Sequence, residues 1–278
     1  SLGDPAPVGN LLIVDSLNIA FRWKHQGVTD FKHDYVRTVE SLAKSYNAGT
    51  IVIAADGGSS YRKEIFPEYK ANRKVKYAEQ TPQEEKEFAM FMAEFSNTLT
   101  LLKEKYPVFQ FKGVEADDIA AYITQHLDDY GLDECWMVSS DRDWDLLISD
   151  RVSRFSTVTR KEITLDNWDE HYDFDIPDYI TFKCLCGDKG DNVPGIPGIG
   201  PKRAVQLMEQ YGDVFDIYNA CPIEGKYKFI QSLNENAEQL LINVELMDLV
   251  TYSETAIGVK NTEVINTTLK RHLNENRL

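Results

Sequence analysis

The segment LLIVD, residues 11–15, decides the fold because four large apolar residues in a row end in an aspartate. A short apolar run of this kind is typical of a buried β-strand. Comparable runs are TIVIAAD (50–56), PVFQFKG (107–113) and CWMVSSD (135–141). Segments with helical periodicity lie between them. This alternation predicts an α/β fold with a mostly parallel central sheet and helices on both faces.

The long helix expected after the second apolar run is well marked. Thr81 is a suitable N-cap residue, and Pro82 suits the first helical position. After Asp178 the chain is expected to be helical, apart from a run rich in glycine and proline at 187–204. We expect helices over 34–47, 81–105 and 116–129, and either a short hairpin or two edge strands over 153–157 and 161–165.

Composition excludes several classes of protein. The 278 residues include 42% hydrophobic and 11% aromatic residues, which is enough for a large core and excludes disorder. No apolar run approaches the ~18–20 residues of a membrane helix, and the first ten residues lack a signal-peptide pattern. We therefore expect a soluble, cytoplasmic protein.

The four cysteines give no functional signal. In a chain of this length they do not make a disulfide framework. Cys184-x-Cys186 has neither a histidine nor a second cysteine pair near it, so we interpret the cysteines as thiols without a function.

Acidic residues follow every one of the four predicted strands. Ligands of open α/β sheets bind outside the carboxyl ends of the strands. A single aspartate in such a place is usually a helix cap. Acids at four strand ends out of four are difficult to explain by capping alone. These acids are Asp15, Asp56, Glu115, Asp117, Asp118, Asp141 and Asp143.

This arrangement of carboxylates predicts a metal centre. Carboxylates that crowd together repel one another unless cations or protons neutralise them. Oxygen ligands without histidine or cysteine favour Mg²⁺ or Mn²⁺. Two such ions ~3.5–4 Å apart can activate a water and stabilise the leaving oxygen in phosphodiester hydrolysis. A cluster of this kind would also hold much of the net charge of −15, so that charge does not exclude a nucleic-acid substrate.

The run GIPGIGPKRA (195–204) predicts a phosphate-binding turn. Glycines let backbone N–H groups face a phosphate at the start of a helix. Lys202 and Arg203 lie at the start of the expected helix, where acidic residues are normally favoured. A plain loop is the alternative, but the basic pair favours a grip on a nucleic-acid backbone. Asp188 and Asp191 precede the run.

Residues 57–80 mix basic and aromatic side chains. Basic residues contact phosphates and aromatic rings can stack on unpaired bases. A solvated surface loop is the alternative. Lys70 and Arg73 would share one face of a helix and could reach one phosphate, with Tyr69 beside them.

Five motifs together resemble the flap endonucleases, or structure-specific 5′ nucleases. The resemblance is strongest to the stand-alone 5′-3′ exonucleases of tailed bacteriophages of the T-five type, and it extends to the nuclease domain of bacterial repair polymerases. One departure is Ser16, where many relatives have a glycine, and we expect it to crowd the DNA end slightly. The motifs are LLIVDSLN (11–18), FPEYKANR (66–73), GVEADD (113–118), SSDRDWD (139–145) and GDKGDNVPGIPGIGPKRA (187–204).

The resemblance implies a nuclease core over 10–180 with a helical arch at about 57–105. It implies a helical region over 181–278 with a helix–three-turn–helix duplex clamp at about 183–211, where backbone carbonyls often hold K⁺. Lys70 and Arg73 match residues that contact the scissile phosphate, and Tyr69 matches a base-stacking neighbour. The clamp and DNA-binding positions are Gly195, Gly198, Gly200, Lys202 and Arg203. The metal-binding acids are Asp15, Asp56, Glu115, Asp117, Asp118, Asp141, Asp143, Asp188 and Asp191.

We therefore interpret the chain as a metal-dependent flap endonuclease with 5′-3′ exonuclease activity in DNA replication and repair. It would use two Mg²⁺, with Mn²⁺ as a substitute, and leave a 5′-phosphate and a 3′-hydroxyl. Lys70, Arg73, Asp141 and Asp143 would be catalytic. The substrate would be branched or 5′-ended duplex DNA with a single-stranded flap. We expect a monomer in the cytoplasm of a host cell, and we find no sliding-clamp motif.

Three other functions remain as alternatives. A ribonuclease of the related acid-cluster type would lack the clamp and the arch. A module that binds branched DNA without cutting it would have lost some of the acids. A phosphate-monoester hydrolase is disfavoured because Asp15-x-x-Asn18 lacks the usual pair of aspartates.

Overall fold

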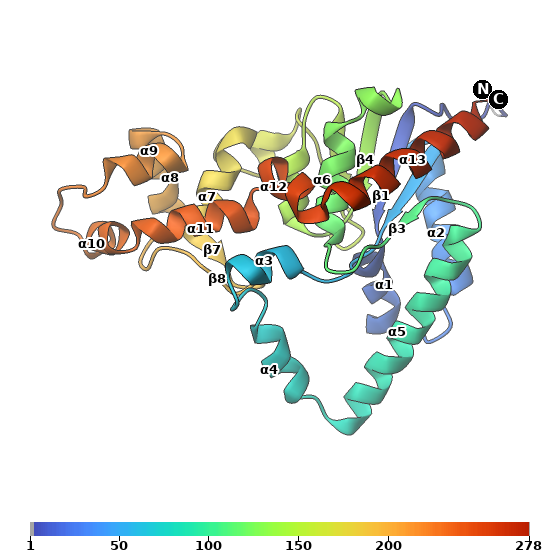
Figure 1. Ribbon diagram of the computed structural model, residues 1–278, viewed down its shortest axis with the longest axis horizontal. Helices are drawn as coiled ribbons and strands as arrows, with labels where there is room; N and C mark the ends of the chain where they lie inside the picture. The colour runs from blue at the N-terminus through green and yellow to red at the C-terminus, as the bar shows by residue number, and fades with distance from the viewer. Residues whose placement is uncertain (1–2, 278) are drawn as a thin grey trace. The chain divides into compact units, whose positions relative to one another are not determined.

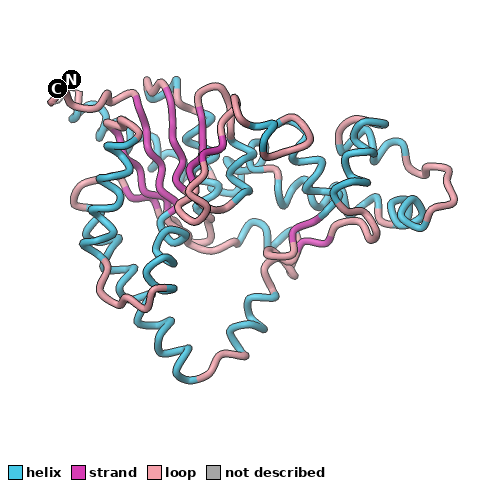
Figure 2. Tube along the Cα trace, turned by 180° about the vertical axis from the view of Figure 1, so that it is seen from behind, coloured by secondary structure: helices cyan, strands magenta, loops and turns pink. Residues whose placement is uncertain are grey.

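The computed structural model describes residues 3–277 and contains a six-stranded sheet (Figures 1 and 2). The strand order is β3-β2-β1-β4-β5-β6, and every pair is parallel except β5 with β6. The predicted fold class is confirmed. The strands are β1 (Asn10–Asp15), β2 (Thr50–Ala54), β3 (Val108–Phe109), β4 (Glu134–Val138), β5 (Val152–Phe155) and β6 (Glu162–Ile163).

Helices cover the sheet on both faces because its strands are apolar on both. Leu12 and Val14 point to the face where α1, α2 and α5 form one cluster. Leu11 and Ile13, the alternate residues of β1, are also fully buried, and α6 contacts both β1 and β2. The helices are α1 (Ser16–His25), α2 (Lys32–Ser45), α5 (Pro82–Lys103) and α6 (Ala116–Gln125), with 3-10 turns η1 (Asp128–Tyr130) and η2 (Arg142–Leu147).

The parallel register aligns the carboxyl ends of the central strands. Val14 pairs with Ile53 of β2 on one side and with Val138 of β4 on the other. Asp15 therefore ends its strand at the same edge as the residues that follow β2 and β4. The sequence-based expectation that the strand-end acids share one edge agrees with this register.

The third strand is much shorter than predicted. Only Val108 and Phe109 pair with β2, whereas the prediction ran from 107 to 113. Beyond them the chain crosses the backbone of Gly57, which donates to the oxygen of Val114 at 2.8 Å. A side chain at Gly57 would lie 1.8 Å from the oxygen of Phe111, so the crossing requires glycine. The crossing ties the loop after β2 to the start of α6.

The long helix α5 begins as predicted. The hydroxyl of Thr81 accepts the N–H of Glu84 at 3.2 Å, and the side chain of Glu84 reaches back to the N–H of Thr81. This capping box fixes the first turn after the exposed residues that precede it. No helix within residues 3–277 is both long enough and apolar enough to cross a membrane.

The chain forms two compact units. The first contains residues 3–59, 80–165 and 253–277, and the second contains 60–79 and 166–252. This division differs from the predicted boundary at residue 180. The difference arises because Phe66 and Tyr69 pack into the core of the second unit, while Asn266 of the last helix bonds to Tyr122 of the first.

The second unit is a helical cluster with a small two-stranded ribbon. Leu185 and Leu233 are fully buried in its core, and α7 packs on α8, α9 and α11. Its helices are α3 (Ser60–Ile65), α4 (Asn72–Ala78), α7 (Tyr179–Cys186), α8 (Pro201–Tyr211), α9 (Val214–Ala220), α10 (Lys228–Glu235) and α11 (Ala237–Met247); the ribbon is β7 (Gly187–Asp188) with β8 (Val193–Pro194). Two further short turns of this unit are η3 (Trp168–Glu170) and η4 (Ile176–Asp178). The helix α12 (Leu249–Ile257) leads back to the first unit, which contains α13 (Val259–Asn276).

Candidate metal centre and nucleic-acid interface

Ser139 links two of the predicted acids of the first unit. Asp15 is only 4% exposed at the end of β1, and its carboxylate accepts the hydroxyl of Ser139 at 2.6 Å. The same hydroxyl accepts the N–H of Asp141 at 3.1 Å. Our sequence reasoning did not single out Ser139. The available signal was its position directly after a strand that neighbours β1.

The start of α6 brings three more acids to this edge of the sheet. The carboxylate of Asp56 accepts the N–H of Ala116 at 2.8 Å, and Glu115 stands at the N-cap position. Asp117 and Asp118 occupy the first helical turn, where the helix dipole favours negative charge. Capping therefore accounts for part of this cluster. It does not account for the burial of Glu115 and Asp118, which are 4% and 1% exposed.

Asp117, Asp141 and Asp143 are arranged as ligands of one ion. Each can offer a carboxylate oxygen within 4.8 Å of those of the other two. The carboxylate of Asp141 also accepts the N–H of Asp143 at 2.9 Å, which fixes their relative position. Burial raises the pKa of Asp117 well above its usual value, and the charges of Asp141 and Glu115 raise it further. The donors are all carboxylates, so this crowded site fits a hard divalent cation.

Asp145, the last acid of the same motif, is not part of this cluster. It is fully buried and forms a two-pronged ion pair with Arg154 of β5. Arg154 also donates to the backbone oxygen of Ser139 at 3.0 Å. The pair therefore holds the backbone oxygen of Ser139 in place, and the charge of Arg154 balances that of Asp145.

Ser16, where we expected crowding of the DNA end, is turned inward. Its residue is fully buried, and its hydroxyl donates to the backbone oxygen of Ala54 at 2.7 Å. The expectation is therefore wrong, because the serine hydroxyl is used to tie α1 to β2.

Asp188 and Asp191 lie together in the second unit, around the turn between β7 and β8. The carboxylate of Asp188 accepts the N–H of Asp191 at 3.0 Å. A cation lies near each acid: the ammonium of Lys183 is 3.7 Å from Asp188, and the guanidinium of Arg73 is 3.3 Å from Asp191. Whether these acids share an ion with those of the first unit depends on how the two units are placed, and stays a prediction.

Lys70 and Arg73 do meet at one charge, but not by the predicted helical spacing. Lys70 precedes α4 and has a φ of 58°, which is left-handed. Its ammonium lies 4.0 Å from the same Asp191 oxygen that Arg73 contacts. The prediction that both lie on one helix is wrong, because a turn brings them together.

Tyr69 is largely buried in this structure. It is 4% exposed and belongs to the apolar core of the second unit. The ammonium of Lys70 lies over its ring at 5.3 Å from the ring centre. The ring therefore supports Lys70 in this structure, and the base-stacking role of Tyr69 stays a prediction.

The glycine-rich turn leads into α8 as predicted. Gly198 has a φ of 81°, and a side chain at Gly195 would lie 2.3 Å from the backbone of Cys186. Gly195 is thus explained by packing against α7, and a DNA contact there stays a prediction. Gly200 is the N-cap residue of the helix, and among the described residues other than its two chain neighbours no atom lies within 4 Å of where its side chain would be.

The two basic residues of α8 differ in their surroundings. Both Lys202 and Arg203 are exposed in the first helical turn, which contains no acid. Arg203 donates to the backbone oxygen of Gly198 at 2.7 Å and stacks over the ring of Phe229 at 4.4 Å. Arg203 therefore stiffens the turn, while Lys202 adds positive charge at the helix start.

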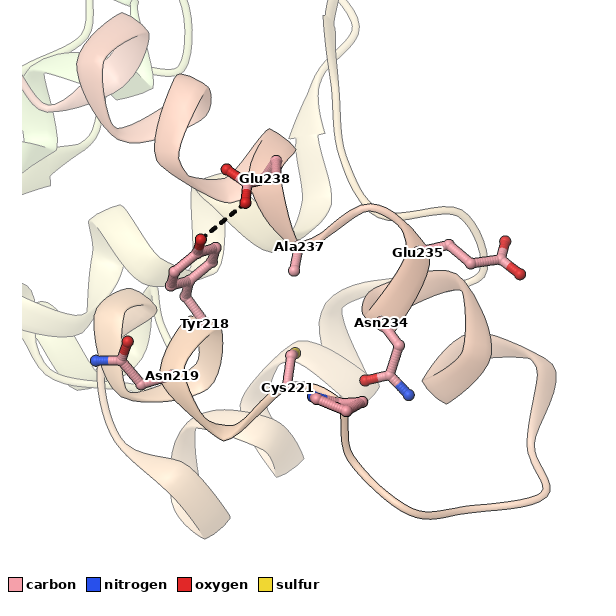
Figure 3. Close-up of a pocket in the computed structure, with 8 residues that line it drawn as sticks. Tyr218, Asn219, Cys221, Asn234, Glu235, Ala237 and Glu238 are labelled. Carbon is pink, nitrogen blue, oxygen red and sulfur yellow. Dashed lines mark hydrogen bonds between the residues drawn. The ribbon is translucent and has the colours of Figure 1, made fainter.

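A separate pocket lies in the second unit between the end of α9 and the start of α11 (Figure 3). The hydroxyl of Tyr218 donates to Glu238 at 2.8 Å across it. None of the predicted site residues lines this pocket, so we place it outside the candidate site. Its lining residues are Tyr218, Asn219, Cys221, Pro222, Asn234, Glu235, Ala237 and Glu238.

Known protein families match almost the whole chain. The N-terminal resolvase-like domain of 5′-3′ exonucleases matches residues 10–173, and their C-terminal SAM fold matches 175–269. The flap endonuclease of Escherichia phage T5 is 43% identical over 260 residues, which are 92% of this chain and 89% of that protein. DNA polymerase I of Rhizobium leguminosarum is 32% identical over 72% of this chain, which matches only 19% of the polymerase.

Solved structures agree with these matches. The T5 5′-exonuclease with bound zinc ions has a TM-score of 0.90 at 40% identity, over 95% of this chain and 99% of that one. A T5 flap endonuclease in a pseudo-enzyme–product complex with DNA and metal ions has a TM-score of 0.89 at 41% identity, over 96% and 98%. The sequence matches, the structural matches and the acid cluster agree with one another. The chain belongs to the 5′-3′ exonuclease family and is a metal-dependent nuclease of the flap endonuclease type.

Proposed function

We propose that this nuclease uses Mg²⁺ to remove single-stranded 5′ flaps from duplex DNA, cutting at or near the junction to leave a 5′-phosphate and a 3′-hydroxyl. The carboxylates of Asp117, Asp141 and Asp143 at one edge of the sheet carry the proposal, because their arrangement fits a hard cation. The T5 relative is named a flap endonuclease, and a homologous structure holds DNA and metal ions.

Nine acids would hold two ions. We assign the tighter site to the acids of β2, α6 and β4, namely Asp56, Glu115, Asp117, Asp118 and Asp141. The second site would use Asp143 with Asp188 and Asp191, and Asp15 would act directly or through water. Divalent ions bound there supply Lewis acidity that activates water and stabilises charge on the phosphate oxygens. Mn²⁺ would substitute for Mg²⁺, since both prefer oxygen ligands.

The basic residues would bind the substrate. Lys70 and Arg73 would contact the scissile phosphate and stabilise the charge that develops on it. Asp141 and Asp143 would hold the reacting phosphate through the ions they bind. Lys202 and Gly200 at the start of α8 would grip the backbone of the duplex without reading its sequence.

Specificity would come from DNA shape. Residues 57–105 would form an arch that admits only a free single-stranded 5′ end. A K⁺ ion held by backbone carbonyls of the clamp would assist duplex binding. Replacing K⁺ by Li⁺ at constant ionic strength should then weaken the duplex affinity, measured in Ca²⁺ by fluorescence anisotropy. An unchanged affinity would exclude the K⁺ site.

The proposed function is tested by cleavage of a 5′-labelled flap substrate, with Mg²⁺ and separately with EDTA. We expect metal-dependent release of the flap at, or within about a nucleotide of, the junction. The variant Asp117→Asn should lose this activity. The matched control Asp129→Asn removes an exposed carboxylate just beyond α6 and should retain it. Binding without cutting in either Mg²⁺ or Mn²⁺ would instead indicate a DNA-binding module.

We also propose that the enzyme acts as a monomer in the cytoplasm of a host cell. This proposal follows from its similarity to a bacteriophage enzyme. Light scattering should give the mass of one chain for the protein alone, and the mass of one chain plus one DNA with a flap substrate. The mass of two chains would contradict the monomer.

A further inference from the structure

Two short segments of the second unit are joined into what we call the clasp, residues 68–73 and 188–192. The first contains Lys70 and Arg73, and the second contains Asp188 and Asp191. In Figure 1 the turn between α3 and α4 lies beside the ribbon β7–β8. Several hydrogen bonds cross the clasp. They include the amide of Asn192 to the backbone oxygen of Glu68 at 2.8 Å, the N–H of Lys70 to the backbone oxygen of Asp191 at 2.8 Å, and the amide of Asn72 to the backbone oxygen of Lys189 at 3.1 Å.

The backbone of the clasp is left-handed at two residues. Lys70 and Asn192 both have a φ of 58°. Asparagine tolerates the left-handed region, but lysine seldom adopts it. A residue in this conformation persists only where its surroundings hold it. The N–H of Lys70 donates to the backbone oxygen of Asp191, the neighbour of Asn192, so the contact across the clasp adjoins both left-handed residues.

The ammonium of Lys70 has little freedom. Its side chain is 17% exposed, and it lies between the carboxylate of Asp191 and the ring of the buried Tyr69. A lysine normally loses much rotamer freedom when it makes a specific contact. Here the backbone turn and the buried ring have already fixed the direction of the side chain.

We propose that Asn192 is a positioning residue for Lys70, and that the clasp makes the phosphate-contacting cation and the acid-bearing loop move as one body. The proposal rests on the role of Lys70 in the proposed function. Asn192 anchors the backbone two residues before Lys70, while the adjacent Asp191 receives the N–H of Lys70 itself. We assign Asn192 no contact with the phosphate, so that it acts only through Lys70.

Asn192→Gly tests this proposal with little backbone cost. Glycine adopts positive φ readily, so the variant removes the amide while leaving the left-handed conformation accessible. The matched control is Asn47→Gly, because Asn47 is exposed, has a φ of 51° and lies in the first unit just before β2. Both variants therefore make the same chemical change at a left-handed asparagine.

The first measurement is hydrogen exchange, which reports the clasp without any cleavage. In Asn192→Gly we expect residues 68–73 to exchange at least about tenfold faster, because the protecting contacts to residues 191 and 192 are loosened. Asn47→Gly should leave this segment unchanged. Unchanged protection in Asn192→Gly would overturn the proposal.

The second measurement is a double-mutant cycle with Lys70→Ala on the single-turnover cleavage rate. We expect Asn192→Gly to slow cleavage roughly tenfold in the presence of Lys70 and less than about twofold in its absence, with duplex affinity unchanged. Equal slowing in both backgrounds would overturn the proposal, since Asn192 would then act independently of Lys70.

The two measurements separate failure of this inference from failure of the proposed function. If Lys70→Ala cleaves as fast as the unmodified enzyme, the proposed role of Lys70 is wrong, whatever the exchange data show. If Lys70→Ala cleaves slowly but Asn192→Gly changes neither the cleavage rate nor the exchange of residues 68–73, only the positioning role of Asn192 is wrong.

Discussion

The acids of the first unit and those of the second are held in different electrostatic surroundings. In the first unit the pKa of Asp117 is raised by burial and by the neighbouring charges of Asp141 and Glu115. In the second, Asp188 lies beside Lys183 and Asp191 beside Arg73. A cation that enters the first cluster relieves repulsion between carboxylates, whereas one that binds the second must displace a cation of the protein. We therefore expect the first cluster to be the stronger metal site.

The largest effect is expected for Asp117→Asn. Cleavage should fall on the order of 10³-fold, because the variant removes a charge from the site that stabilises the reacting phosphate. The melting temperature of the metal-free protein should rise at the same time, since one of several mutually repelling carboxylates is gone. Single-turnover kinetics and thermal unfolding in EDTA measure the two effects. A lower melting temperature would show that Asp117 stabilises the fold and is not under repulsion.

A smaller loss is expected for Lys70→Ala. Cleavage should slow roughly 100-fold because a cation that faces the developing charge is lost, while duplex affinity stays within about twofold. Lys260→Ala is the matched control, because Lys260 is an exposed lysine of α13, outside both the clasp and the proposed arch. An equal loss of binding and cleavage would show that Lys70 grips DNA without acting on the scissile phosphate.

The framework of the site was predictable from sequence because its signals are local. Apolar runs that end in acids predicted the strands, and Thr81 with Pro82 predicted the start of α5. The length of β3 was not predictable. It depends on a backbone crossing between Gly57 and Phe111, which lie far apart in the sequence.

The role of individual side chains was harder to predict because it also depends on residues that lie far apart in the sequence. Asp143 and Asp145 are two residues apart and look alike in the sequence, yet a buried arginine of another strand neutralises only Asp145. Tyr69 resembled a stacking residue because its neighbours are basic, but its ring is part of the core of the second unit. Long-range packing decided both roles, and a single sequence does not contain it.

Metal binding should stabilise the protein in a pH-dependent way. A carboxyl whose pKa is raised on folding destabilises the folded state at pH values above that raised pKa, and the cost disappears as the pH falls through it. Saturating Ca²⁺ should therefore raise the melting temperature by roughly 5 °C at pH 8 and by less at pH 5. Asp188→Asn should retain most of this gain, and Asp117→Asn should lose most of it. The reverse order would place the stronger site in the second unit.

The smallest effect concerns competition between protein cations and metal at Asp191. The ammonium of Lys70 and the guanidinium of Arg73 lie near one oxygen of this carboxylate, and a metal ion must displace them. Since partly exposed ion pairs contribute little, Lys70→Ala should raise the affinity of the weaker Mn²⁺ site by no more than about fivefold, measured by calorimetry without DNA. Lys260→Ala should leave it unchanged. If the weaker site instead loses Mn²⁺ affinity in Lys70→Ala, Lys70 must hold the loop of Asp188 and Asp191 in place. Its contact with Asp191 would then favour metal binding and would not compete with it.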